Sequence, residues 1–355
     1  MSLSKQKIGI LTFHKSPSYG AVLQCFALFS ALKNMGRAEV GVIDFTPPRM
    51  TRFTKGGKRN VFQEFSNRRL NMLTNGSDDL LKCLSSLKDD SQPVTDIVVG
   101  SDQVWNAAIV KESLIDYCLG RELPGVRKHA YAASFGTSSL NVNEDILQIY
   151  SRALADYQSI GVREKSAVGI CQSLGRNDIV NVIDPTLLVD PEIYTPMIDR
   201  NFVPNRLCGY FLENAGYQAK IMKKIARKQK TSPQFLGIKA PFFSFVKSIH
   251  APEVEGFLSA IHNSSGVVTD SFHGMCFAII FKRPFIVLPS QRKERFVRLA
   301  ELLERFGLQD RIIADYDTNK AVSKLLEPID YSRVDEIIRQ YRGESLEFIN
   351  RIFDK

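Results

Sequence analysis

Residues 267–289 read VVTDSFHGMCFAIIFKRPFIVLP, an order that predicts a strand, a polar loop, a helix and a second strand. Two valines open the stretch, and the polar loop runs to Gly274. The apolar run 275–281 is the expected helix, and 285–288 is the next strand. Strand, helix and strand in this order predict a parallel sheet with helices on its faces.

His273 is the one histidine of this loop, and it stands where the helix should begin. A helix N-terminus presents free backbone N–H groups and the positive end of the helix dipole, so it favours anions. A histidine there can donate to a phosphate or carboxylate, or it can transfer a proton. The spacing also fits an ordinary connection in which Asp270 or Ser271 caps the helix. The residues alone leave both interpretations open.

The rest of the chain repeats this alternation and predicts an α/β fold. The expected strands of the first half are 7–12, 40–45, 96–100, 129–134, 159–162 and 180–183, with helices at 21–34 and 144–156. The pattern restarts after residue 190, with strands at 208–212, 234–237, 267–269 and 285–288 and helices at 218–230 and 253–261. Helical patterns follow at 294–306 and 321–353. Ligands of such sheets bind beyond the carboxyl ends of the strands.

This restart predicts two Rossmann-like domains facing a cleft, a GT-B-like arrangement. We expect an N-terminal domain over 1–195, with a polar and basic insertion at 46–92, as the acceptor side. A C-terminal domain over 196–330 is expected to be the donor side. The last helix, 331–355, is expected to pack back on the N-terminal domain.

The composition excludes several classes of protein. No apolar stretch approaches the ~20 residues that span a bilayer, and the start of the chain is expected to be a strand and not a signal peptide. The six cysteines form no C-x-x-C pair, so we expect reduced core thiols of a cytoplasmic protein. No nucleic-acid module and no metal-ligand spacing is found, so we expect neither partner.

The net charge is +9, and the basic charge is partly concentrated in two segments, 49–58 and 223–230. Each is either a solvated surface or a contact for anionic lipid headgroups or a lipid-linked acceptor. On the second interpretation we expect peripheral contact with the inner face of the membrane.

Six segments in order resemble motifs of the polysaccharide pyruvyl transferase family. They are SYGAVLQ at 18–24, VGSDQVWN at 99–106, YAASFG at 131–136, VREKS at 162–166, DPTLL at 184–188 and SFHG at 271–274. The resemblance covers about residues 8–310 and implies the same GT-B-like architecture. This sequence departs from it at two places: Ser18 stands where many relatives have asparagine, and Ser271 stands where some have arginine.

The resemblance implies a transferase of cell-surface polysaccharide assembly. The donor is phosphoenolpyruvate, two hydroxyls of a sugar or lipid-linked oligosaccharide add to its C2, and phosphate leaves as a ketal forms. Such a site needs cations and backbone N–H groups for two anionic groups, and an acid–base group near neutral pH. No cofactor and no metal is implied.

Candidate residues follow from the matched motifs. The catalytic candidates are His273 and Asp102; the donor or phosphate-binding candidates are Arg163, Ser271, Gly274 and Arg295; the acceptor or cleft candidates are His14, Ser18, Tyr19, Gly20 and Trp105. Cations that could replace the missing arginine at 271 are Lys282, Arg283, Arg292 and Arg295.

Three of these candidates have structural alternatives. Arg163 fits a surface ion pair with Glu164 or Asp156 as well as a donor contact. Asp102 fits a helix cap as well as a base. Trp105 fits a core anchor as well as a stacking face for a sugar.

Two other functions stay open. One is a transferase of the same fold with a nucleotide-sugar donor, in which the diphosphate would lie at the His273 helix. The other is a non-catalytic protein that binds a glycan or sugar phosphate. The sequence names neither the acceptor sugar nor the oligomeric state.

Overall fold

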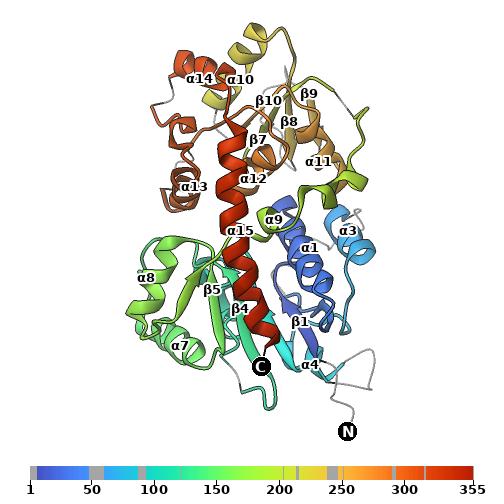
Figure 1. Cartoon of the computed structure of the whole chain (residues 1–355), viewed down its shortest axis with the longest axis vertical. Helices are drawn as coiled ribbons and strands as arrows, with labels where there is room; N and C mark the ends of the chain where they lie inside the picture. The colour runs from blue at the N-terminus through green and yellow to red at the C-terminus, as the bar shows by residue number, and fades with distance from the viewer. Residues whose placement is uncertain are drawn as a thin grey trace. The chain divides into compact units, whose positions relative to one another are not determined.

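A computed structural model describes residues 6–47, 60–86, 93–120, 122–202, 204–212, 216–237, 247–250, 252–289, 293–315 and 317–354. The chain divides into two compact units, one of Met1–Val189 with Gln340–Lys355 and one of Asp190–Arg339 (Figure 1). Each unit contains one parallel sheet with helices on its faces. The prediction of an α/β fold is confirmed.

The N-terminal unit has a six-stranded sheet in the order β2-β1-β3-β4-β5-β6. Its strands are β1 (Lys7–Leu11), β2 (Glu39–Val42), β3 (Asp96–Val99), β4 (Arg127–Ala133), β5 (Ser159–Val162) and β6 (Ile179–Asn181). Its helices are α1 (Tyr19–Asn34), α3 (Val61–Arg69), α4 (Leu80–Ser85), α5 (Ala107–Val110), α6 (Leu114–Tyr117), α7 (Glu144–Ala155), α8 (Lys165–Ser173) and α9 (Pro185–Leu188), with a 3₁₀ turn η1 (Lys111–Ser113). The strand order reverses between β1 and β3, which makes that position the switch point of the sheet.

The C-terminal unit has a five-stranded sheet in the order β11-β10-β7-β8-β9. Its strands are β7 (Leu207–Tyr210), β8 (Pro233–Gly237), β9 (Lys247–His250), β10 (Gly266–Thr269) and β11 (Phe285–Val287). Its helices are α10 (Gly216–Lys228), α11 (Val254–His262), α12 (Phe272–Ile280), α13 (Lys293–Arg305) and α14 (Thr318–Leu326), with 3₁₀ turns η2 (Pro191–Met197) and η3 (Gln309–Arg311). The switch point of this sheet lies between β7 and β10.

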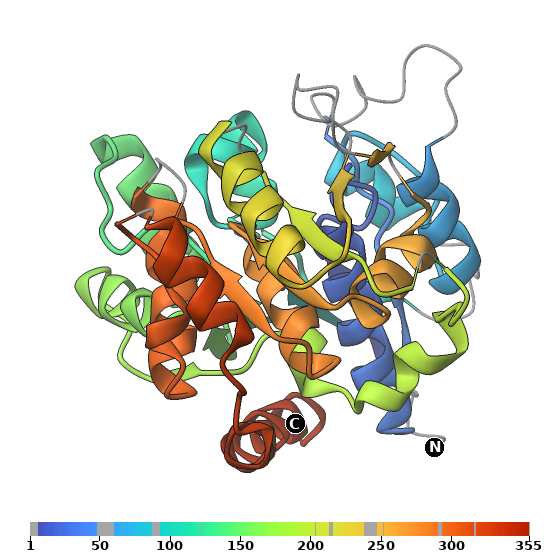
Figure 2. The same cartoon turned by 90° about the horizontal axis from the view of Figure 1, so that it is seen from above.

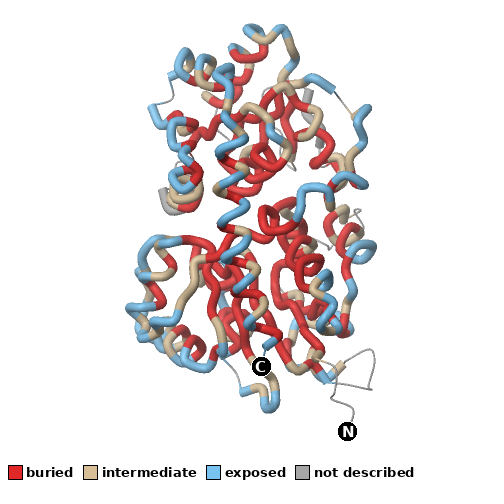
Figure 3. The backbone as a smooth tube through the Cα atoms, viewed as in Figure 1, coloured by how far each residue is buried: buried red, intermediate tan, exposed pale blue. Residues whose placement is uncertain are grey.

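The strands read as apolar runs because helices cover both faces of each sheet. All five residues of β1 and all four of β3 are buried. Burial follows the strands and the inward helix faces, and exposed residues lie on the outer turns (Figure 3). Separate apolar clusters fill the two units, one around Trp105 and one around Met222.

The last helix, α15 (Tyr331–Phe353), passes from one unit to the other, because the division falls between its residues 339 and 340. It is one continuous rod, vertical in Figure 1 and end-on in Figure 2. Its C-terminal part packs on the N-terminal sheet: a Cβ at Gly161 of β5 would lie 2.9 Å from Phe348 Cε1. Its first turn belongs to the C-terminal unit, where the Tyr331 hydroxyl donates to Arg283 O at 2.5 Å.

The structure differs from the predicted elements in several places, among them helix α8, which was not predicted. The helix expected over 321–353 is two helices, α14 and α15, with Pro328 between them, since proline cannot continue a helix. Strand β9 was not predicted. Within the expected insertion at 46–92, helices α3 and α4 are described, and the basic segment 49–58 lies outside the described residues.

Candidate active site

The carboxyl edge of the N-terminal sheet gathers most of the predicted polar residues. The segment after β1 contains His14 and Ser18, the segment after β3 contains Asp102, and Arg163 directly follows β5. Strands β1 and β3 are paired in parallel, so their following segments emerge side by side at the switch point.

Asp102 is held by backbone contacts to the neighbouring strand. Its carbonyl oxygen accepts from Ser134 N at 3.0 Å, and it forms an isolated parallel bridge with Ala133. Its φ of 74° lies in the left-handed region. The preceding Gly100 has a φ of 117°, and a Cβ there would lie 2.2 Å from Tyr131 O. Only glycine allows this close approach of the chain to β4.

Asp102 caps no helix, because α5 begins at residue 107 and is capped by the Asn106 side chain. Its carboxylate instead accepts from Arg163 Nη2 at 3.4 Å. Among the described residues Arg163 is its one ion-pair partner, and 14% of the side chain is exposed. Asp102 therefore presents a carboxylate at the edge of the sheet, as a base needs.

Arg163 lies among three carboxylates. Its Nε donates to Glu164 at 2.9 Å and its Nη1 to Asp184 at 3.1 Å, while the contact to Asp102 is the longest. The side chain is only 2% exposed. Burial alone would lower the pKa of Arg163, but Glu164, Asp102 and Asp184 outweigh it and raise the pKa above its usual range. The guanidinium stays charged in a fixed orientation, and the ion pair with Glu164 is buried instead of lying on the surface.

His14 is part of a buried charged cluster. Its Nε2 lies 2.9 Å from Asp44 Oδ1 and its Nδ1 lies 3.2 Å from Thr12 O. Burial raises the pKa of Asp44, but hydrogen bonds from His14 and Lys15 outweigh it and lower that pKa to about 2. The His14 ring is 1% exposed, which corrects the prediction that it lines an acceptor cleft.

The SYG motif begins helix α1. Ser18 is the N-cap, and its hydroxyl accepts from Ala21 N at 3.4 Å. Tyr19 is 1% exposed and packs edge-on against Phe62 at 5.0 Å between ring centroids. Tyr19 therefore belongs to the core, which corrects its assignment to an acceptor cleft. Gly20 is buried in the first turn of the helix, and Ser18 alone of the three is partly exposed.

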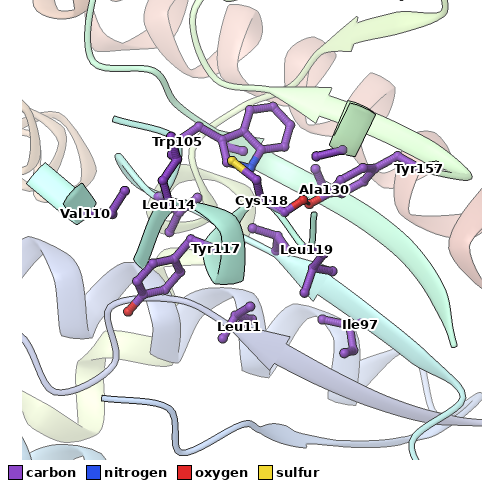
Figure 4. Packing of buried hydrophobic residues seen from close by; sticks show 14 of the residues in the cluster. Leu11, Ile97, Trp105, Val110, Leu114, Tyr117, Cys118, Leu119, Ala130 and Tyr157 are labelled. Carbon is purple, nitrogen blue, oxygen red and sulfur yellow. Dashed lines mark hydrogen bonds between the residues drawn. The ribbon is translucent and has the colours of Figure 1, made fainter. Parts of the chain in front are cut away.

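Trp105 also belongs to the core. Its side chain is fully buried and packs against Phe135, with 5.3 Å between ring centroids. Tyr157 packs against it at 5.8 Å, in the cluster that Figure 4 shows. Cys118 and Leu119 lie in the same cluster. A sugar cannot stack on a fully buried ring, so the prediction of a stacking face is wrong and its alternative, a core anchor, is right.

The carboxyl edge of the C-terminal sheet is built around the SFHG motif. Ser271 is the N-cap of α12, and its hydroxyl accepts from Gly274 N at 3.3 Å. Thr269 ends β10, and its hydroxyl donates to Tyr210 O of β7 at 2.5 Å while accepting from Ser271 N at 3.0 Å. The start of α12 is thereby fixed at the switch point of this sheet.

Gly274 allows α12 to approach the sheet. A Cβ at this position would lie 2.6 Å from Thr269 Oγ1 and 3.0 Å from Tyr210 Cδ1, closer than side chains pack. Nearby, Asp270 Oδ1 accepts from Leu212 N at 2.7 Å and ties the segment after β10 to the segment after β7. Gly274 thus serves packing at the helix entrance.

His273 lies in the first turn of α12 and is 7% exposed. Its ring packs edge-on against Phe272 at 5.3 Å between centroids. The cap at Ser271 and the position of His273 at the helix N-terminus are both present, so the two interpretations of this motif are compatible.

The cations proposed to replace an arginine at 271 are differently placed. Lys282 is exposed and pairs with Asp335 at 2.6 Å. Arg283 is half-buried, and its Nε donates to Phe281 O at 3.1 Å. The side chain of Arg295, in α13, and residue 292 lie outside the described part of the chain.

The described residues contain no group of three or more His, Cys, Asp or Glu side chains that could hold a metal ion. All six cysteines are free and buried. Burial raises the pKa of Cys171 to about 12, which leaves the thiol protonated. Within the described residues, no helix combines the length and apolar character needed to cross a membrane.

Comparison with known proteins identifies the family. The family model of polysaccharide pyruvyl transferase matches residues 19–292, which include both switch points. The chain belongs to the polysaccharide pyruvyl transferase family. A pyruvyl transferase is a transferase enzyme, and the family contributes to polysaccharide biosynthesis. A comparison with curated protein sequences gives no match.

Solved structures establish the fold of this pyruvyl transferase family member. It is similar to UDP-GlcNAc 2-epimerase of Methanocaldococcus jannaschii, with 15% identity over 98% of both chains and a TM-score of 0.52. It is also similar to UDP-N-acetylglucosamine 2-epimerase of Rickettsia bellii, with 10% identity, coverage of 98% and 96% and a TM-score of 0.56. The enzyme of Neisseria meningitidis bound to UDP-GlcNAc gives 12% identity, coverage of 96% and 94% and a TM-score of 0.53. These relatives confirm the GT-B-like fold class.

Sequence reasoning missed Thr12 and Gln24, which join β1 and α1 to the segment that precedes Asp102. Gln24 was one letter of a matched motif. Its position among apolar residues of α1 was the available signal, because a buried amide needs hydrogen-bond partners.

Proposed function

We propose that this protein transfers a pyruvyl group from phosphoenolpyruvate to two hydroxyls of one sugar in a cell-surface polysaccharide or its precursor. Two C–O bonds form at C2 of the donor, and the bond from C2 to the phosphate oxygen breaks. One hydroxyl proton reaches C3, which becomes a methyl group, and the other leaves with inorganic phosphate. No electrons are exchanged, so the step needs no redox cofactor and no reactant besides the donor and the sugar acceptor.

The observation that carries this proposal is the family match over residues 19–292. It is supported by the placement of His273 and Ser271 at a helix N-terminus on the switch point of the C-terminal sheet. Backbone N–H groups and the helix dipole there favour the phosphate of the donor. In the proposal His273 donates to that phosphate or delivers the proton to C3.

The N-terminal edge is proposed to serve the acceptor. Asp102 takes the proton from a sugar hydroxyl, since its carboxylate is partly exposed and has one ion-pair partner among the described residues. Arg163 is held by Glu164 and Asp184 and also donates to Asp102, so its positive charge is proposed to hold the carboxylate of the base in place.

Thermal unfolding with phosphoenolpyruvate tests the donor assignment. A ligand at 100 times its dissociation constant stabilises the folded state by ~2.7 kcal/mol. We expect an upward shift of the melting temperature with phosphoenolpyruvate, lost in His273→Ala and retained in the matched control His262→Ala. His262 is also a partly buried histidine of this unit, and it contacts Asn263 at 2.9 Å. No shift with phosphoenolpyruvate, or an equal shift in His273→Ala, contradicts the assignment.

A nucleotide-sugar donor is the second candidate, favoured by the fold shared with UDP-GlcNAc 2-epimerases. The same experiment separates the two, because that candidate predicts a shift with a UDP-sugar and none with phosphoenolpyruvate. A non-catalytic glycan-binding protein predicts binding of a glycan and no release of phosphate.

We further propose a cytoplasmic location with peripheral contact to the inner face of the membrane. Helix α10 carries five cationic side chains and no acidic one, namely Lys220, Lys223, Lys224, Arg227 and Lys228. Each basic residue near an anionic bilayer contributes roughly 1 kcal/mol. We expect co-sedimentation with phosphatidylglycerol vesicles, weakened in Lys220→Glu/Arg227→Glu and unchanged in the control Lys320→Glu. Equal binding to neutral phosphatidylcholine vesicles would refute this contact.

A further inference from the structure

Gln24 is a buried amide in an otherwise apolar segment of α1, and none of its side chain is exposed. Its Nε2 donates to Ala21 O at 2.7 Å and to Thr12 Oγ1 at 3.0 Å. Its Oε1 accepts from Ser101 N at 3.1 Å. These contacts fix the orientation of the amide, because Nε2 faces two acceptors and Oε1 faces a backbone N–H. Burial of an amide is costly unless its hydrogen bonds are made, and here two of the three join α1 to the switch point, while the third stays within α1.

Thr12, the residue that follows β1, completes this arrangement. Its hydroxyl accepts from Gln24 and donates its one proton to Ser101 O at 2.9 Å. The N–H and the C=O of Ser101 are therefore both held, one by Gln24 and one by Thr12. These groups belong to two successive peptide units. Residues of β1 and α1 therefore hold the backbone that leads into residue 102.

Asp102 directly follows this held backbone. On its other side Ser134 N donates to Asp102 O at 3.0 Å, and Asp102 N donates to the Ser101 hydroxyl at 2.6 Å. The carboxylate meets Arg163 at 3.4 Å. Thr12, Gln24 and Ser101 are fully buried, so none of them reaches a substrate.

We propose that Gln24 and Thr12 are positioning residues that set the direction of the Asp102 carboxylate toward Arg163 and the acceptor hydroxyl. The role assigned to Asp102 rests on the proposed function, whereas the positioning of its carboxylate does not.

Thr12→Val tests the proposal, since valine keeps the shape and removes the hydroxyl. The assay is phosphate release from phosphoenolpyruvate with p-nitrophenyl hexosides as acceptor probes. We expect kcat to fall at least about tenfold with KM for phosphoenolpyruvate within about twofold, because misplacing a catalytic group by an ångström costs up to about a hundredfold. Thr12→Ser, which restores the hydroxyl, should recover most of the rate. Gln24→Met serves as the second variant if Thr12→Val folds poorly.

The matched control is Thr95→Val. Thr95 joins the same two strands at the opposite edge of the sheet, where its hydroxyl accepts from Lys7 N at 3.0 Å and donates to Asp96 at 2.7 Å. We expect this variant to lose stability and to keep kcat. A fall of kcat in Thr95→Val equal to that in Thr12→Val would mean that any polar link between β1 and β3 has the same effect, and it would overturn the proposal.

A double-mutant cycle with Asp102→Asn separates positioning from general damage. If Thr12 acts through Asp102, adding Thr12→Val to Asp102→Asn lowers kcat by less than about twofold, because the two residues act as a unit. Additive losses would overturn the proposal.

Crystal structures of the variants decide the matter even if wild type releases no phosphate, which would be a failure of the proposed function alone. The contact between Asp102 and Arg163 should open beyond hydrogen-bond distance in Thr12→Val and persist in Thr12→Ser. An unchanged contact in both variants would overturn the positioning role.

Discussion

Replacement of the buried Asp96 should destabilise the N-terminal unit. It lies at the amino end of β3, fully buried, on the edge of the sheet opposite the candidate site. Arg127 donates to its two oxygens at 2.8 and 2.9 Å, and His129 Nε2 lies 3.1 Å from Oδ1. Thr95 and Gln6 donate at 2.7 and 3.0 Å. Asp96→Asn keeps the shape and removes the charge.

The expected loss of unfolding free energy depends on the cations that remain after the carboxylate is removed. Breaking a buried ion pair from one side costs about 3–5 kcal/mol. Arg127 is 32% exposed and can regain water, so we take the lower limit of about 3 kcal/mol for this site. For a unit of about 200 residues this corresponds to a fall of about 6–12 °C in melting temperature, at about 2–4 °C per kcal/mol.

The pH dependence has a defined sign. Burial raises the pKa of Asp96, but hydrogen bonds from His129, Arg127, Thr95 and Gln6 outweigh it and hold that pKa well below its usual range. The folded-state pKa is therefore lower than the unfolded value of about 4, so the stabilisation is present above about pH 4 and is lost as pH falls further. The gap between wild type and Asp96→Asn should be constant from pH 5 to 7 and shrink below pH 4.

Urea unfolding at pH 7, 5 and 3.5 measures this gap. The matched control is Asp354→Asn, because Asp354 pairs with Arg37 of the same unit at 2.6 Å and the two side chains are 57% and 42% exposed. Exposed pairs contribute ~1 kcal/mol or less. Equal losses in the two variants, or a gap that does not shrink below pH 4, would refute the reasoning that burial makes the Asp96 cluster decisive.

Three further predictions concern packing. Gly274→Ala should lower the free energy of unfolding, measured with urea, by about 1–3 kcal/mol, because the new Cβ would lie 2.6 Å from Thr269 Oγ1. The variant should also lose its stabilisation by phosphoenolpyruvate. An unchanged melting temperature would contradict the clash. The fluorescence of Trp105, the one tryptophan of the chain, should shift to the red on unfolding and stay unchanged when a glycan binds, whereas a shift on binding would argue for an exposed ring. Phe348→Ala should lower the free energy of unfolding, measured by thermal unfolding, by about 3–5 kcal/mol, because the ring is buried against Gly161 of β5. A loss below about 1 kcal/mol would mean that α15 does not stabilise the N-terminal sheet.

Sequence patterns were sufficient where the signal is local. Alternating apolar runs and helices predicted both parallel sheets, since each strand is buried on both faces and reads as apolar by itself. The N-cap role of Ser271 and the helix entrance at His273 were also readable, because a cap and its first turn are neighbours in sequence. The motif order predicted the family, which the family model confirms.

Whether individual polar and aromatic side chains are buried or exposed could be read only from the tertiary structure. Trp105 and Tyr19 sit in matched motifs, yet both are core residues. Burial depends on what packs against a residue from distant segments, such as Phe62 against Tyr19. Strand β9 depends likewise on its pairing with β8. The break before α15 is different, because Pro328 is a local signal that the sequence prediction overlooked.

By itself the sequence determined the fold class, the family and the two segments that end at the switch points, because those follow from periodicity and from contiguous motifs. Only the tertiary structure decided that Gln24, Thr12 and Arg163 converge on Asp102, residues that are up to 151 positions apart in the chain. Hydrogen bonds have a reach of about 3 Å, so their partners are set by how strands are ordered in a sheet, and that order is not written in any one segment.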